Sequence, residues 1–389
     1  MPRDVKKFTK KKFIFNIGVD LHREFFGKYN GAVQLELKGL DHDKVYDFLL
    51  NSSDDECAPE VMETLHCIND LASPEGADIL KGEADRNGLV IGGEQELSVE
   101  ELAFTAFLRH KDVFDRAHDL HICHNVKSPS EYVGIDERPF AHTPERIETF
   151  RNSIAEYFNE RYKGKYCDVR VYPDEDEINI VIMHGKHLKS GTFIIDDQPQ
   201  PTRYRDLKED LVTYASVDGR LKVSAATEDE RNEIARRFGE CFFDNAAFFM
   251  GQDCQNLYTL EPLVTLGTDF KFNYDWDPET LNVRFTEVQI LMSAAGGRRR
   301  RNVSSITVRD IDCLDRLDGH RTIDITKREI NYVIMKFTFL TNGREKTISV
   351  KLKPPSLCHF DRRMFEDTIM EHLKRNGFAT ERKPAAVSA

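Results

Sequence analysis

Residues 142–265 constrain the fold most, because helix, strand and turn signals all agree there and nowhere else in the sequence. Thr143 is a good helix N-cap, and Pro144 suits the first helical position, where its missing N–H costs nothing. Apolar residues then recur at three- and four-residue spacing: Ile147, Phe150, Ile154, Tyr157 and Phe158. A second helix is predicted at the end of this stretch, with Thr227 and Glu230 as its capping box.

Two β-hairpins are predicted between these helices. In the first, residues 169–172 and 178–183 alternate in polarity on either side of a polar turn. Its second strand is apolar on both faces, so we expect it to be the more buried one. In the second hairpin, residues 211–215 and 221–225 flank an Asp-Gly pair at 218–219, which readily adopts the positive φ angles of a tight turn. This order predicts an α+β domain with helices on one sheet.

Four segments of this region carry a resemblance: residues 205–214, 218–223, 237–239 and 258–263. They resemble parts of uncharacterised bacterial proteins that are associated with anti-phage defence and mobile-element loci. The resemblance implies a bacterial cytoplasmic accessory protein. The segments contain no catalytic motif, so the resemblance assigns no role to any residue.

The first 130 residues predict a mixed N-terminal α+β domain. Residues 13–19 and 32–37 have the composition of two strands, and Asn30-Gly31 favours a hairpin turn between them. Helices are predicted to follow at residues 43–50, 59–71 and 98–117, the last opened by a capping box of Ser98 and Glu101. A polar linker is expected to connect this domain to residue 142.

Residues 266–382 predict a β-rich C-terminal domain. Strands are expected at 281–285, 288–292 and 303–308, and a hairpin at 332–340 and 346–352. A closing helix is predicted from Asp361 to the Asn376-Gly377 pair, and residues 383–389 are predicted to be a disordered tail. We therefore expect a multi-domain α+β protein with antiparallel β-hairpins.

Composition narrows the class of protein. The chain carries 55 Lys and Arg against 67 Asp and Glu, a net charge of −12, which argues against a protein that coats nucleic acid with its whole surface. No apolar run approaches the roughly 18 residues that a membrane span needs, and the N-terminus lacks the apolar core of a signal peptide. Eight scattered cysteines without a C-x-x-C pair indicate reduced thiols. We expect a cytoplasmic protein that contacts no membrane.

Basic residues concentrate in the last third of the chain. A Gly-Gly pair at 296–297 precedes the five residues of the candidate contact loop: Arg298, Arg299, Arg300, Arg301 and Asn302. Residues 296–355 contain 14 Lys and Arg against 7 Asp and Glu, so this region carries +7 while the remainder carries −19. Adjacent guanidinium groups repel one another unless an anion meets them. We expect this loop to contact DNA, RNA or an acidic protein partner; the alternative is a hairpin tip that its charge keeps soluble.

A zinc site is a second hypothesis. His118, His121, Cys123 and His124 lie close together in the sequence, and nitrogen and sulfur donors at such spacing can bind zinc. However, no second pair of ligands lies at a standard distance. A buried thiol with surface histidines is the favoured interpretation.

Asp20, Glu36 and Lys38 suggest a catalytic alternative. A carboxylate followed by Glu-x-Lys on a strand is the arrangement in which some metal-dependent nucleases hold a divalent ion and position a water molecule. The same residues fit an ordinary half-buried strand with Glu36 and Lys38 on its solvent side. No P-loop, dinucleotide-binding glycine motif, serine-hydrolase elbow or zinc-protease helix occurs.

These observations predict a non-enzymatic accessory or adaptor protein of a bacterial defence or DNA-processing system. We expect it to bind nucleic acid or a protein partner through the basic C-terminal loop and to need no cofactor. In this interpretation a partner protein carries the enzymatic activity. The metal-dependent nuclease remains the alternative.

Overall fold

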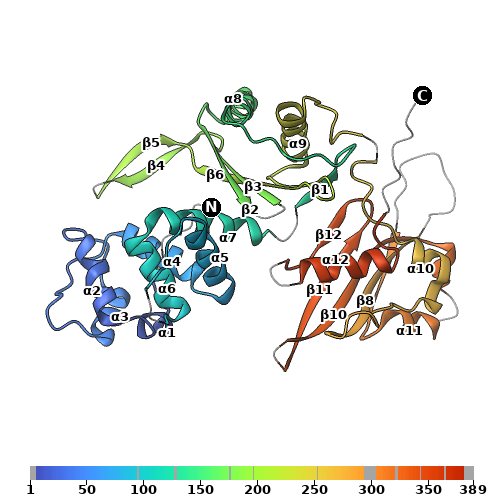
Figure 1. The fold of residues 1–389 in the computed structure, drawn as a ribbon, viewed down its shortest axis with the longest axis horizontal. Helices are drawn as coiled ribbons and strands as arrows, with labels where there is room; N and C mark the ends of the chain where they lie inside the picture. Colours follow the sequence, from blue (N-terminus) through green and yellow to red (C-terminus); the bar gives the residue numbers. More distant parts are fainter. Residues whose placement is uncertain are drawn as a thin grey trace. The chain divides into compact units, whose positions relative to one another are not determined.

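A computed structural model describes residues 6–93, 96–126, 129–174, 177–195, 197–251, 253–292, 304–319, 323–341, 343–362 and 365–380. The chain divides into two compact units, Met1–His124 and Asn125–Ala389 (Figure 1). The predicted α+β class is confirmed: the first unit is helical, and the second contains antiparallel sheets with helices. The finer division at residues 142 and 265 stays a prediction, and the predicted tail at 383–389 lies outside the described residues.

All helices and strands that the structure describes in the N-terminal unit are helices. Its helices are α1 (Lys11–Phe15), α2 (Val19–Lys28), α3 (His42–Asn51), α4 (Pro59–Leu71), α5 (Pro74–Arg86), α6 (Val99–Arg109) and α7 (Lys111–His124). They bury one apolar core, in which Phe25, Leu65 and Phe104 have no exposed surface. The predicted capping box is confirmed, since the Ser98 hydroxyl accepts from the Glu101 N–H and the Glu101 side chain accepts from the Ser98 N–H.

The two strands predicted near the N-terminus are wrong. Residues 13–19 form the end of α1 and the start of α2, because Phe13, Ile14 and Ile17 are all buried and their spacing suits a helix. Residues 32–37 do alternate between core and solvent, as predicted. They make only isolated β-bridges, such as the one between Val33 and Cys57, because no strand lies beside them in the described part of this unit.

Two boundaries of the N-terminal unit also differ from prediction. The helix predicted at 98–117 is two helices, because the backbone leaves the helical region at His110, where φ is −135°. Helix α5 was missed: it begins at Pro74 after the N-cap Ser73, whose hydroxyl accepts from the Gly76 N–H.

The first sheet of the second unit confirms the predicted helix, two hairpins and helix. Its strands are β1 (Ser130–Val133), β2 (Cys167–Asp174), β3 (Glu177–Gly185), β6 (Leu207–Ala215) and β7 (Arg220–Ser224), in the antiparallel order β1-β7-β6-β3-β2. Helices α8 (Pro144–Glu160) and α9 (Glu228–Phe243) pack on one face (Figure 1). Strand β3 is the most buried, as expected. Strand β1 was missed, because it lies in the stretch predicted to be a linker.

A separate ribbon leaves this sheet between β3 and β6. It consists of β4 (Lys189–Ile195) and β5 (Gln198–Tyr204), which pair only with each other among the described residues. The sequence did not predict this hairpin, because Pro199 and Pro201 are uncommon in strands. We call β4 and β5 the arm.

The second sheet forms the C-terminal part of this unit. Its strands are β8 (Thr280–Met292), β9 (Ser304–Arg309), β10 (Glu329–Thr341), β11 (Arg344–Lys353) and β12 (Leu357–His359), in the antiparallel order β12-β11-β10-β8-β9. The apolar core on one face includes residues of α10 (Glu261–Leu266), α11 (Cys313–Asp318), α12 (Glu366–Arg375) and η2 (Ile325–Lys327), and Phe270, which follows η1 (Gly267–Asp269). The predicted hairpin is confirmed as β10 and β11.

Strand β8 corrects the prediction of two short strands at 281–285 and 288–292. The register against β10 shifts after Phe285, so that Ile334 pairs with Glu287 and Met335 pairs with Phe285. This bulge changes which residues face the core. The buried residues have odd numbers before it (Val283 and Phe285) and even numbers after it (288 and 290). The break in polarity therefore marks a bulge within one strand. The closing helix starts at Glu366, later than predicted, and ends at Arg375 as expected.

A buried ion-pair network joins the two sheets of the second unit. Glu131 of β1 is fully buried and accepts hydrogen bonds from Arg220 (2.9 Å), Arg362 and the Tyr258 hydroxyl (3.0 Å). Because Arg220 belongs to the first sheet and Arg362 follows β12, the Glu131 carboxylate contacts both sheets, and the Lys222–Glu366 pair (2.9 Å) joins β7 to α12 beside it. We call Glu131, Arg220, Arg362 and Tyr258 the buried network.

Candidate functional site

The face of the second sheet opposite its helices is polar and open to solvent. On β8 the inward side chains are Val283 and Phe285, whereas Asn282 and Arg284 point outward. On β10 Lys336 is exposed between two buried neighbours. This alternation follows from the two-residue period of a strand with one face on the core. We call this surface the open face.

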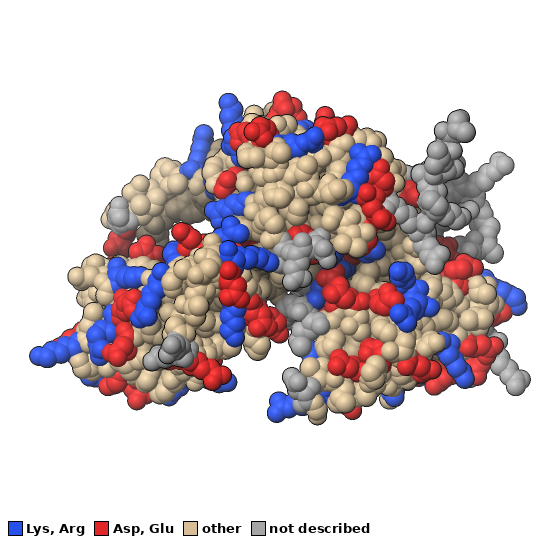
Figure 2. Space-filling view, viewed as in Figure 1, with Lys and Arg blue, Asp and Glu red and all other residues tan. Residues whose placement is uncertain are grey.

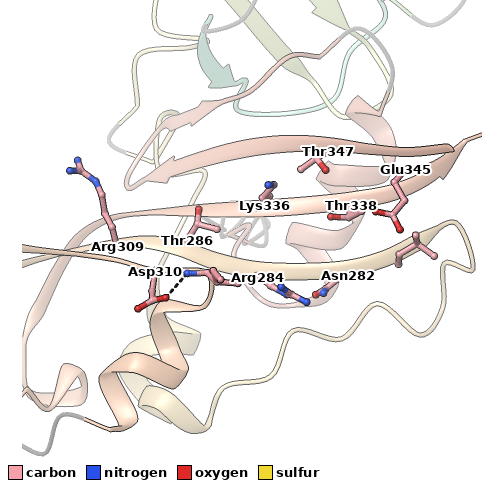
Figure 3. Close-up of a pocket in the computed structure, with 11 residues that line it drawn as sticks. Asn282, Arg284, Thr286, Arg309, Asp310, Lys336, Thr338, Glu345 and Thr347 are labelled. Carbon is pink, nitrogen blue, oxygen red and sulfur yellow. Dashed lines mark hydrogen bonds between the residues drawn. The ribbon is translucent and has the colours of Figure 1, made fainter.

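The open face contains a hollow of about 800 Å³. Figure 3 shows side chains from four neighbouring strands along it. Its lining residues are Leu281, Asn282, Arg284, Thr286, Arg309, Asp310, Ile311, Lys336, Thr338, Glu345 and Thr347. The lining is mainly hydroxyl, amide and charged groups, a composition that suits a polar ligand better than an apolar one.

Arg284 and Lys336 are the central charges of the hollow. They lie directly opposite each other on β8 and β10, so their Cβ atoms are about 5 Å apart. Neither side chain has an acidic partner among the residues that the structure describes. Like charges in opposed positions destabilise a sheet, and an anion between them would remove this repulsion. This pair is the feature of the open face that most clearly indicates a ligand.

The other charges of the hollow are largely neutralised. Arg309 donates to Glu287 over 2.6 Å, and this hydrogen bond holds the pKa of Glu287 below its usual range. Arg316 donates to Asp310 over 2.6 Å and lowers the pKa of that carboxyl in the same way. Glu345 lies four residues along β11 from the position opposite Lys336, about 13 Å away along the strand. Among the described residues of the hollow, no carboxylate without a basic partner therefore lies next to Arg284 and Lys336, where it would compete with an incoming anion.

Neutral donors surround this pair. Asn282, Thr338 and Thr347 form one row across three strands, and Ser349 continues the row of Arg284 and Lys336. Hydroxyl and amide groups of this kind commonly contact phosphate oxygens together with Arg and Lys. The open face therefore presents, on one surface, the kinds of side chain that contact phosphate.

Basic side chains do not cover the molecule as a whole. On the side visible in Figure 2, Lys and Arg are interspersed with Asp and Glu, as the net charge of −12 leads one to expect. An anion-binding site in this protein must therefore be local.

The predicted contact loop cannot be placed against this site. Arg298, Arg299, Arg300, Arg301 and Asn302 lie outside the described residues, in the connection between β8 and β9. The pairing of these two strands confirms that the loop connects a hairpin. Arg284 lies eight residues before the end of β8 at Met292, about 27 Å along the strand from where the loop begins.

The predicted zinc ligands all lie on α7. His118, His121 and His124 are spaced by three residues along the helix, and Cys123 is buried. Within the described ranges, no three His, Cys, Asp or Glu side chains are grouped so that they could hold a metal ion.

The predicted nuclease residues lie on different elements. Asp20 is on α2, where its carboxylate pairs with Arg23 one turn later. Glu36 and Lys38 are exposed on either side of Leu37, whose carbonyl accepts from Arg23 over 3.4 Å, and this segment is not a strand. The strand-borne Glu-x-Lys on which this hypothesis depended is therefore missing.

A Thr-His-Asp contact inside the second unit is structural. His372 Nε2 lies 2.9 Å from the Thr280 hydroxyl and 3.2 Å from Asp277. Both contacts use the same ring nitrogen, whereas proton relay through a catalytic histidine uses one nitrogen for each partner. All three groups are buried or nearly so, and they fasten the start of β8 to α12.

Comparison with known proteins adds no relative: no protein-family model matches the chain, and a search of curated proteins finds no match. No helix in the described part of the chain is long and apolar enough to cross a membrane.

Proposed function

We propose that this chain binds nucleic acid through the open face, with Arg284 and Lys336 contacting backbone phosphate. The observation that supports the proposal is the opposed basic pair without an acidic partner among the described residues. The surrounding hydroxyl and amide groups supply further phosphate donors. The excess of Lys and Arg over Asp and Glu in residues 296–355 supports the same ligand class.

The test is the salt dependence of binding. Fluorescence anisotropy with labelled single-stranded and duplex oligonucleotides, in DNA and RNA, measures affinity across a range of salt concentrations. Arg284→Ala/Lys336→Ala removes two phosphate contacts. We expect weaker binding and a salt slope shallower by about 1.4 for single strands or about 1.8 for duplexes, because each contact contributes about 0.7 or 0.9.

A matched control removes the same charge elsewhere in the unit. Arg236→Ala/Arg375→Ala deletes two guanidinium groups whose partners, Glu233 and Glu371, lie within 3 Å. This variant should keep the parental slope. Equal losses in both double variants would show only a net-charge effect, and parental affinity in Arg284→Ala/Lys336→Ala would refute the proposed site.

We also propose that the protein acts as an accessory subunit whose partner carries out the chemistry. The resemblance described above supports this role. Affinity purification of the full chain from its host, with and without nuclease treatment, should recover a partner enzyme. Cleavage of nucleic acid by the purified chain with Mg²⁺, abolished by Glu36→Ala, would instead favour the nuclease alternative.

A further inference from the structure

The arm is a two-stranded ribbon with apolar side chains exposed to solvent. Ile194 is 79% exposed and Ile195 is 38% exposed. The ribbon has one internal aromatic contact, between Phe193 and Tyr204, whose ring centroids are 4.9 Å apart. Two-stranded ribbons are marginally stable without further strands or a packing surface. This combination indicates that the arm has a partner.

Proline positions determine which edge of the arm is available. In the register, Pro199 lies opposite Ile194 and Pro201 lies opposite Thr192. Proline has no N–H to donate, so both positions fall at the non-hydrogen-bonded pairs and face away from β4. The outer edge of β5 therefore lacks donors at 199 and 201 and is blocked against another strand.

The outer edge of β4 is not blocked. The backbone groups of Ser190, Thr192 and Ile194 belong to the same non-hydrogen-bonded pairs, so they point outward on this side. This edge contains no proline, and no further strand pairs with it among the described residues. It presents alternate N–H and C=O groups, which is the pattern that an added strand requires.

We propose that the β4 edge pairs antiparallel with β4 of a second copy of this chain, around a two-fold axis at Thr192. This register places Thr192 opposite its own counterpart and Ser190 opposite Ile194, with backbone hydrogen bonds at each pair. Thr–Thr pairs across antiparallel strands are favourable. Gly191 then lies opposite Phe193 of the other copy.

The charges at the tip and the base of the arm favour a second copy of this chain as the partner of the β4 edge. The exposed tip of the arm carries Asp197, and its base carries His187 together with Lys186 and Lys189, which share the single carboxylate of Asp206. Because the two β4 strands would run antiparallel, the tip of each arm lies near the base of the other. The acidic tip of each arm thus lies near the lysines of its counterpart.

The first test is the oligomeric state of the full chain by sedimentation equilibrium. Thr192→Pro removes an outward N–H and leaves the ladder of the arm intact, so dimerisation should weaken at least tenfold. Arg203→Pro is the matched control, because residue 203 faces outward on the edge that is already blocked. A monomeric parent chain, or equal effects of the two prolines, would overturn the proposal.

The second test fixes the register. Antiparallel positions that share hydrogen bonds have Cα atoms about 5.5 Å apart. Thr192→Cys should therefore cross-link efficiently with a short bismaleimide, whereas Ser190→Cys should react less, since its counterpart is a different residue. The parent chain sets the background of its own cysteines, which are mostly buried. Equal cross-linking at both positions would contradict the register, and nucleic-acid binding does not enter either readout.

Discussion

Replacing Glu131 by Gln removes the one negative charge at the centre of the buried network. Glu131 lies on β1 and has no exposed surface. Burial alone would raise the pKa of its carboxyl, but the charges of Arg362 and Arg220 outweigh this effect and lower the pKa below its usual range. Glu131 is therefore ionised at neutral pH. A glutamine of nearly the same size would remove the counter-charge that the two guanidinium groups share, leaving Arg220 with Asp218 (3.2 Å) and Arg362 with Glu366.

The expected loss follows from the cost of removing the shared charge from a buried group of ion pairs. Removing one member of a buried ion pair typically destabilises a protein by about 3–5 kcal/mol. Each 1.4 kcal/mol is a factor of about ten in the folded-to-unfolded ratio, so Glu131→Gln should lower this ratio by at least a hundredfold. The hydrogen bond from Tyr258 can persist with the glutamine carbonyl, which makes the lower end of the range the safer expectation.

Urea unfolding monitored by tryptophan fluorescence measures this loss. Trp276 is the only tryptophan in the chain and lies in the same unit, with its ring centroid 4.5 Å from that of His372. Glu148→Gln is the control, because the Glu148–Arg151 pair is exposed and should contribute little. If Glu131→Gln changed the free energy of unfolding by less than about 1 kcal/mol, the network would not hold the sheets as described.

A triple variant separates charge from packing. In Glu131→Leu/Arg220→Met/Arg362→Met the three charged members of the buried network become apolar, Lys222 keeps its 2.9 Å pair with Glu366, and the Tyr258 hydroxyl loses Glu131 as its acceptor. Such replacements are often neutral or stabilising. The triple variant should therefore be more stable than Glu131→Gln alone. The opposite order would mean that shape, and not charge compensation, dominates at this site.

Three further predictions concern other parts of the chain. Burial lowers the pKa of His22 from 6.5 to about 4. The N-terminal unit should therefore lose about 3 kcal/mol of stability as the pH falls from 6.5 to 4, which urea unfolding followed by far-UV circular dichroism measures. If His22→Gln kept the same pH dependence, His22 would not be its cause. Thr227→Ala should cost about 1 kcal/mol of unfolding free energy by removing the N-cap of α9, whereas Thr227→Ser should retain most of it. Gly134→Ala should cost about 1–3 kcal/mol, because the new Cβ would lie 2.2 Å from the buried ring of Phe248; a neutral result would show that the ring can move.

Local sequence signals determined much of the secondary structure. The N-caps Thr143 and Ser98 start their helices, and Gly219 in the predicted turn has a φ of 63°. The alternation of residues 169–172 and 178–183 became the paired strands β2 and β3. These predictions succeeded because caps, tight turns and alternation depend on neighbouring residues along the chain.

Other outcomes depended on contacts distant in the sequence. Residues 32–37 alternate as a strand does, yet without a neighbouring strand they form only isolated bridges. Glu230 was expected to complete a capping box with Thr227, but its carboxylate pairs with Lys163, 67 residues away. A charged partner of opposite sign in a buried position outweighs a local backbone contact.

The candidate site shows the same division between local and distant information. The outward positions of Arg284 and Lys336 could be inferred from strand alternation alone. Their apposition could not, because it requires β10 to lie beside β8 and the bulge after Phe285 to set the register. The sequence by itself determined the strands and their polar faces. The tertiary structure alone decided which polar residues meet, because strand order and register come from packing over the whole core.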